Sequence, residues 1–177
     1  MPAGPGVQAP AFLYQSTSAL RRSASEAYVA RVQQRNPAAA ALISSELGRH
    51  DYDRIYTGIV APYGYRPNDA ADGLAAYTLL GWLIANGQAD IPPRQAAAVR
   101  AQIAFRAAGS PVFASPASRA QLGEELKLLF VTLHAGWQSA RREGTLRQYA
   151  DGVAIMFRNN GTDLRALRLS DSGFAGR

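Results

Sequence analysis

The stretch from Leu74 to Ala85, LAAYTLLGWLIA, carries no charged side chain. It is too short to cross a bilayer, because a membrane-spanning helix needs about 20 apolar residues. A helix that is apolar on every face is stable in water only when other elements cover it. We therefore expect this segment to be a central helix, around which the rest of the chain packs.

A second segment also has the pattern of a core helix. It begins at the start signal Ser115-Pro116, and its apolar residues recur at helical spacing as far as Trp137. Capping and turn residues divide the remainder into further helices, and no segment has a convincing strand pattern. Residues 164–174 are expected to form either a short helix or an extended tail that docks on the bundle. The expected helices cover about residues 18–36, 37–47, 51–60, 68–85, 92–109, 116–142 and 145–159.

The fold class that follows is all-α. We expect one compact domain over residues 16–177, a bundle of six or seven helices with crossed packing, preceded by a flexible tail over residues 1–15. No heptad repeat is sustained, which argues against a coiled coil. The predicted core contains Leu74, Tyr77, Leu80, Trp82 and Ile84 from the first central helix and Leu126, Leu129, Phe130, Leu133 and Trp137 from the second.

The composition removes several classes of protein. The 177 residues include no cysteine, so the chain forms no disulfide, thiolate metal site or cysteine nucleophile. Lysine and arginine number 19 against 13 acidic residues, a net charge of +6, and Lys127 is the only lysine. A positive balance favours anionic partners. The basic residues are scattered and no nucleic-acid-binding motif is present, so we expect no nucleic-acid partner.

Five of the eight tyrosines fall between residues 52 and 77, with arginines among them. These residue types are common in binding hot spots, because they combine rigid contact area with a polar end. The same rings could instead wedge the neighbouring helices against each other. The turn between those helices is expected to be ordered, with Asn68 capping the helix that follows. The candidate binding residues are Tyr52, Tyr56, Tyr63, Tyr65, Arg66 and Tyr77.

A second set of polar residues shares one arc of the predicted helix over 116–142, away from its leucine stripe. These side chains could line a second cleft, or they could be the one solvated strip of a mostly buried helix. The set consists of Glu124, Lys127, His134 and Gln138.

The run from His50 to Asp53 places one imidazole and two carboxylates within a helical turn. No second group of ligands has the spacing of a known metal motif, so we expect Asp51 to be a helix cap and we expect no metal or other cofactor. The motifs of serine hydrolases, phosphate-binding loops and dinucleotide-binding folds are also missing from the sequence.

Two functions therefore stay open. The first is a non-catalytic protein that binds a protein or a cell-envelope component, as an inhibitor, immunity or envelope-assembly factor. The second is an envelope hydrolase acting on peptidoglycan or a similar polymer. In that case Glu124 or Asp53 would be the general acid, with His134 or His50 nearby.

Four blocks of the chain resemble an uncharacterised bacterial family of small helical proteins: FLYQSTSALRR, NPAAAALISSEL, IVAPYGYRPNDAADGLAAYTLLGWLIANG and LRLSDSGF. Members of that family are usually made with an export leader. The resemblance implies an all-helical periplasmic or secreted protein and supplies no catalytic residue. The segment MPAGPGVQAPAF lacks the basic and apolar regions of a signal peptide, so a cytoplasmic location is the alternative.

Overall fold

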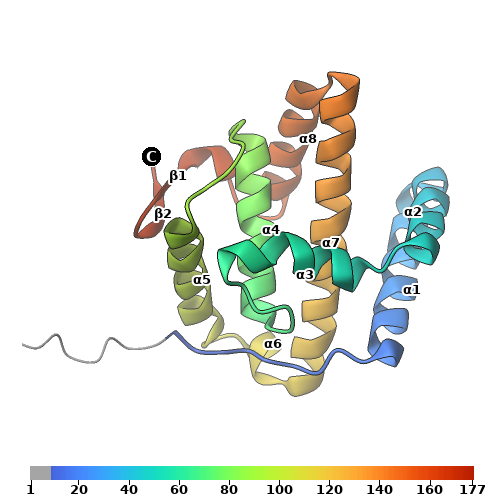
Figure 1. The fold of residues 1–177 in the computed structure, drawn as a ribbon, viewed down its shortest axis with the longest axis horizontal. Helices are drawn as coiled ribbons and strands as arrows, with labels where there is room; N and C mark the ends of the chain where they lie inside the picture. The colour runs from blue at the N-terminus through green and yellow to red at the C-terminus, as the bar shows by residue number, and fades with distance from the viewer. Residues whose placement is uncertain (1–8) are drawn as a thin grey trace, which may run out of the picture.

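A computed structural model describes residues 9–177 of the chain. Over this range the fold is a bundle of eight α-helices that cross one another, with a single two-stranded sheet at the C-terminal end (Figure 1). The predicted all-α class is confirmed. The helices are α1 (Ser18–Arg35), α2 (Pro37–Arg49), α3 (Tyr52–Val60), α4 (Ala70–Ala85), α5 (Pro93–Ala107), α6 (Pro111–Ala114), α7 (Pro116–Glu143) and α8 (Leu146–Asn159).

Helix α4, which contains the charge-free stretch from Leu74 to Ala85, lies at the centre of the bundle, as that stretch predicts. It packs against α7, α5 and α8, and Figure 1 shows it between α5 and α7. Gly81 allows the close approach of α8, because a Cβ atom at this position would lie 2.6 Å from two ring carbons of Phe157. The predicted core is largely confirmed. Leu80, Trp82, Ile84, Leu126, Phe130 and Leu133 are buried, whereas Leu74, Tyr77, Leu129 and Trp137 are partly exposed.

The helices α1 and α2 form a hairpin that packs on the bundle through contacts between α1 and α7. Figure 1 shows this hairpin at one side of the bundle, beyond α7. Asn36 ends α1 and also caps α2, because its side chain accepts a hydrogen bond from the amide of Ala39. The following Pro37 occupies the first turn of α2, where the missing N–H costs nothing.

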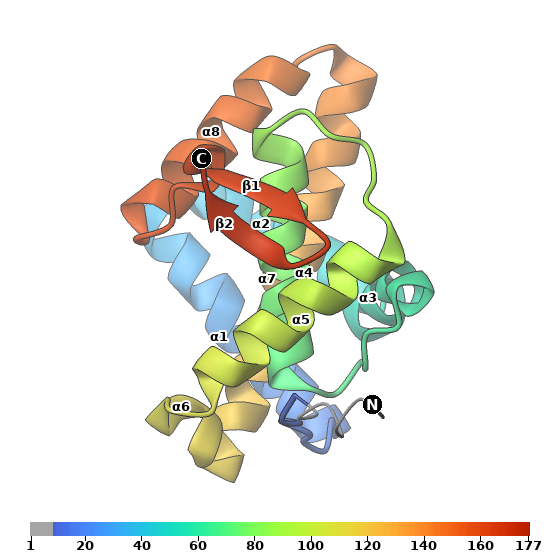
Figure 2. The ribbon, with the colours of Figure 1, turned by 90° about the vertical axis from the view of Figure 1, so that its left-hand side faces the viewer.

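The prediction of no strand is wrong at the C-terminal end. Residues 164–166 form a short 3₁₀ turn, which is followed by the antiparallel strands β1 (Leu167–Ser170) and β2 (Gly173–Gly176). Gly173 adopts a φ of 94°, which favours glycine in the hairpin turn. Phe174 packs against Trp82, so the hairpin covers one side of α4 beside α5 (Figure 2). Strands this short give too little alternation to identify from sequence.

The expected flexible tail is wrong for residues 9–15, while residues 1–8 lie outside the described part of the chain. Phe12 is buried against Phe113, and its backbone N–H donates to the carboxylate of Asp69. Leu13 and Asp69 form an isolated antiparallel bridge. The segment is therefore a strap, defined here as residues 9–17, which runs along the lower edge of the bundle in Figure 1.

The cap of α4 is Asp69 rather than the predicted Asn68. The Asp69 carboxylate accepts hydrogen bonds from the amides of Ala71 and Asp72. The turn before it is ordered as predicted, and Gly64 has a φ of 76° that suits glycine. Among residues 9–177, no helix combines the length and the apolarity that crossing a membrane requires.

Candidate functional site

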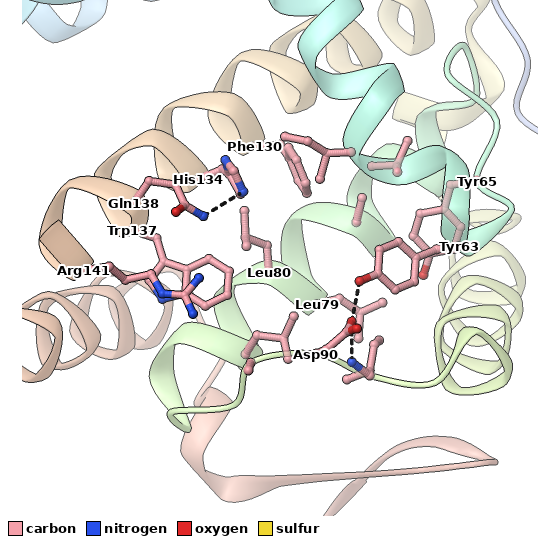
Figure 3. Close-up of a pocket in the computed structure, with 16 residues that line it drawn as sticks. Tyr63, Tyr65, Leu79, Leu80, Asp90, Phe130, His134, Trp137, Gln138 and Arg141 are labelled. Carbon is pink, nitrogen blue, oxygen red and sulfur yellow. Dashed lines mark hydrogen bonds between the residues drawn. The ribbon is translucent and has the colours of Figure 1, made fainter.

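Parts of the two predicted residue sets meet in one pocket. Tyr63 and Tyr65 approach it from the turn after α3, and His134 and Gln138 approach it from α7. The pocket has a volume of about 300 Å³, at the small end of the range for ligand sites. We call it the anchor pocket. Figure 3 shows these side chains around a common space, with α4 behind them.

The floor of the anchor pocket is apolar. It is formed by α4, which contributes Leu79, Leu80 and Leu83, and by Phe130 of α7. The aliphatic residues Ile59 and Val60 at the end of α3 extend it. Because α4 and α7 are the central helices of the bundle, the floor is part of the packed core and its shape is set by the fold.

One edge of the anchor pocket carries negative charge. The hydroxyl of Tyr63 donates to Oδ1 of Asp90 at 2.5 Å, and the amide of Ile91 donates to the same oxygen at 2.8 Å. These hydrogen bonds hold the pKa of the Asp90 carboxyl below its ordinary value. Burial and the bond to Asp90 raise the pKa of Tyr63 to about 12. At neutral pH this edge therefore presents an anionic carboxylate and a neutral phenol.

The opposite edge is one face of α7. His134, Trp137, Gln138 and Arg141 follow one another at helical spacing, so their side chains project on the same side. The Nε2 atoms of Gln138 and His134 lie 3.3 Å apart, and the guanidinium of Arg141 lies 5.0 Å from the centre of a Trp137 ring. Burial, aided by the charge of Arg141, lowers the pKa of His134. The imidazole is therefore neutral at pH 7, and Arg141 supplies the positive charge of this edge.

Glu124 and Lys127, expected to face a cleft or solvent together with His134, do neither. Their side chains are 0% and 1% exposed. The Lys127 ammonium donates to Glu124 at 3.0 Å, to Asp53 at 2.5 Å and to Asn68 at 2.9 Å. The prediction of a cleft or a solvated strip is therefore wrong for these two residues. Partners from α3 and the following turn allow the charges to be buried.

Tyr52 and Tyr14 complete this buried network. The Tyr52 hydroxyl donates to one oxygen of Glu124 at 2.5 Å, and the Tyr14 hydroxyl donates to the other at 3.2 Å. Tyr14 approaches closely because it packs over Gly123, where a Cβ atom would lie 2.2 Å from its ring. The network therefore joins the strap, α3 and α7, and it lies outside the anchor pocket.

Arg66 also forms ion pairs inside the fold. Its guanidinium lies 2.8 Å from Asp69 and 3.3 Å from Asp72, two carboxylates at the start of α4. Arg100 of α5 contacts Asp72 from the other side at 2.5 Å. Arg66 therefore fastens the turn to α4 and does not line the anchor pocket.

The remaining tyrosines of the predicted set pack in the core. Tyr56 is fully buried and lies edge-on to Phe130, and among the described residues its hydroxyl has no hydrogen-bond partner. Tyr77 packs against Phe157 of α8. These two rings therefore pack between helices, which is the alternative to a binding role that the sequence left open.

The run from His50 to Asp53 does not form a metal site. Asp51 caps α3, as predicted, and the exposed His50 lies 3.5 Å from Glu46. Over residues 9–177 no group of three or more His, Asp or Glu side chains is arranged to hold a metal ion.

Three residues at the edges of the anchor pocket are absent from the predicted sites: Trp137, which is predicted as a core residue, Arg141, and Asp90, which lies in a loop without periodicity. The spacing of Trp137 and Arg141 from His134 is a signal that could have identified these two residues. Comparison with models of known protein families, with curated proteins and with solved structures found no match to this chain.

Proposed function

We propose that this chain is a non-catalytic binding protein, whose anchor pocket receives an apolar side chain of a macromolecular partner. The observation that carries the proposal is the combination of an apolar floor with edges of opposite charge, Asp90 on one side and Arg141 on the other. An apolar pocket of about 300 Å³ fits one large side chain. The charged edges can bind polar groups of the partner segment on either side of that side chain.

The packing of the pocket supports a preformed site. Its floor belongs to the core, the hydrogen bond to Asp90 holds Tyr63, and Trp137 lies between His134 and Arg141. Side chains that are held in this way lose little conformational entropy when a partner binds. A buried aromatic or aliphatic anchor in such a pocket is the usual centre of a binding hot spot.

The geometry does not support Glu124 as the general acid of a hydrolase. A general acid at neutral pH needs a carboxyl with a raised pKa near a second acid. Burial opposes ionisation of Glu124, but the neighbouring hydroxyls of Ser16 and Tyr52 and the charge of Lys127 hold its pKa below the ordinary value. The anchor pocket is lined by one carboxylate, Asp90, and His134 shares no cleft with Glu124.

The resemblance to exported helical bacterial proteins supports the location that we propose. The partner would then be a protein or an envelope component in the periplasm or outside the cell, and the chain would be an inhibitor, immunity or envelope-assembly factor. A cytoplasmic partner is the alternative.

The test is selection of ligands from a displayed library of random peptides. We expect the selected peptides to share one large apolar residue, and we expect Trp137→Ala to weaken their binding at least about tenfold, because it removes a wall of the pocket. The control is Phe105→Ala, which removes an exposed aromatic ring on α5 outside the pocket. Peptides that bind both variants equally well, or a library that yields no peptide, would contradict the proposal.

A further inference from the structure

A second hollow adjoins the anchor pocket and is lined by several arginines. Its volume is about 550 Å³, and it shares Ala89, Trp137 and Arg141 with the anchor pocket. The two hollows are therefore neighbours on the surface, with the Trp137 and Arg141 side chains at their common border. We call the second one the arginine hollow. Its remaining lining residues are Ile84, Ala85, Gly87, Gln88, Leu146, Arg147, Ala150, Asp151 and Arg165.

The charges of the arginine hollow are not balanced. It is lined by three arginines and one acid, Asp151. The acid is already paired, since Arg165 donates to it at 2.6 Å and also donates to the backbone oxygen of Ala85. Within residues 9–177, neither Arg141 nor Arg147 has an ion-pair or hydrogen-bond partner, and both are exposed. Two positive charges are therefore available beside the anchor pocket.

The chemistry of these two side chains favours carboxylates. A guanidinium binds a carboxylate through two parallel hydrogen bonds, and it is more weakly hydrated than an ammonium. The Arg141 guanidinium lies over the ring of Trp137, and both residues line both hollows. Arg147 lies on the first turn of α8 and lines the arginine hollow but not the anchor pocket. An extended chain leaving the anchor pocket past Trp137 would meet Arg141 first and Arg147 next.

We infer that the partner segment is an acidic peptide, in which one large apolar residue enters the anchor pocket and the acidic residues beside it pair with Arg141 and Arg147. This inference rests on the function proposed above and adds the chemical class of the ligand. The complementary charge of the segment would speed its association and set its direction along the groove.

A peptide fits the combined groove better than a nucleic acid does. The floor of the anchor pocket is aliphatic as well as aromatic, and its outer edge carries the anionic Asp90, which would repel a phosphate. A nucleic-acid site needs a row of basic side chains that contacts successive phosphates. Here, among the described residues, only two unpaired arginines lie next to an apolar pocket.

The experiment measures fluorescence anisotropy with short labelled peptides that differ only beside a single phenylalanine. One peptide carries a run of glutamates there, the second glutamines and the third lysines, and a labelled single-stranded oligonucleotide is the fourth probe. We expect the glutamate peptide to bind about tenfold more tightly than the glutamine peptide, with a difference that shrinks as salt is added. The lysine peptide should bind most weakly.

Variants assign the effect to the two arginines. Arg141→Gln and Arg147→Gln should each weaken binding of the glutamate peptide about threefold and the double variant about tenfold, as expected for exposed ion pairs. Arg147→Gln, which lies outside the anchor pocket, should change the affinity of the glutamine peptide no more than about twofold. The matched control is Arg158→Gln, which removes an exposed arginine of α8 outside both hollows.

The outcomes separate the two proposals. If the glutamate and glutamine peptides bind equally and both depend on Trp137, the acidic-peptide inference is wrong and the anchor pocket stands. If no peptide binds in a way that depends on Trp137, both proposals fail. Binding of the oligonucleotide that is lost in the Arg141 and Arg147 variants would overturn the inference in favour of nucleic acid.

Discussion

The ammonium of Lys127 lies 3.0 Å from a carboxylate oxygen of Glu124 one turn earlier on α7, and both side chains are almost completely buried. Lys127 is also the only lysine of the chain. A charge pair in the interior is stable only when further hydrogen bonds satisfy both groups, and here Asp53, Asn68, Tyr52 and Tyr14 supply them. The pair therefore holds the strap, α3 and the following turn against α7.

Replacing Lys127 by methionine should destabilise the fold by about 3 kcal/mol, because the change leaves the buried Glu124 without its cation. The measurement is the urea denaturation midpoint together with the slope of the transition. The control is Arg158→Met, an exposed site where we expect a change within about 0.5 kcal/mol. Adding Glu124→Leu to the Lys127→Met variant should restore part of the loss. A single variant as stable as the parent would show that the network contributes little.

The network also makes stability depend on pH. The pKa of Glu124 is lower in the folded chain than its ordinary value of 4.5, despite the opposing effect of burial. The unfolded chain then binds the proton more readily, so the stabilising contribution is complete above pH 4.5 and is lost as the pH falls through the folded pKa. We expect Glu124→Gln to be less stable than the parent at pH 6, with a smaller difference at pH 3. A stability difference between the parent and Glu124→Gln that stays constant from pH 6 to pH 3 would contradict the lowered pKa of Glu124.

The start of α4 should be more sensitive than an ordinary helix cap. Asp69 caps the helix, pairs with Arg66 and accepts the backbone N–H of the buried Phe12. Asp69→Ala removes all three interactions, and we expect a loss of about 3 kcal/mol. Asn36→Ala removes a cap in an exposed position and should cost about 1 kcal/mol. The measurement is the free energy of unfolding of the two variants from chemical denaturation. Equal losses would mean that the contacts of Asp69 with the strap and with Arg66 do not add to stability.

The central helices could be predicted because the absence of charge and the spacing of apolar residues are local properties of the sequence. The candidate site could be predicted only in part. Tyr63, Tyr65, His134 and Gln138 were identified, but as members of two separate sites, since helical periodicity indicates which face a residue occupies and not which helix it meets. The burial of Glu124 depends on partners such as Tyr52 that are distant in sequence, so its polarity alone suggested a face open to water.

The last prediction concerns His134, which lies in the anchor pocket between Phe130 and Trp137. Burial and the neighbouring charge of Arg141 lower its pKa, so an NMR titration of the ring should have a midpoint below the ordinary value of 6.5. Arg141→Gln removes the charge and leaves the burial, so the midpoint should rise only part of the way towards that value. Because the folded pKa is the lower one, the contribution of His134 to stability is complete above pH 6.5 and falls as the unfolded chain takes up the proton.

An acidic peptide that pairs with Arg141 should raise the midpoint of the His134 titration, because the peptide offsets the charge of Arg141. The matched glutamine peptide should not raise it. A midpoint at or above 6.5 in the free protein would show that the imidazole is solvated and that the pocket is not closed around it.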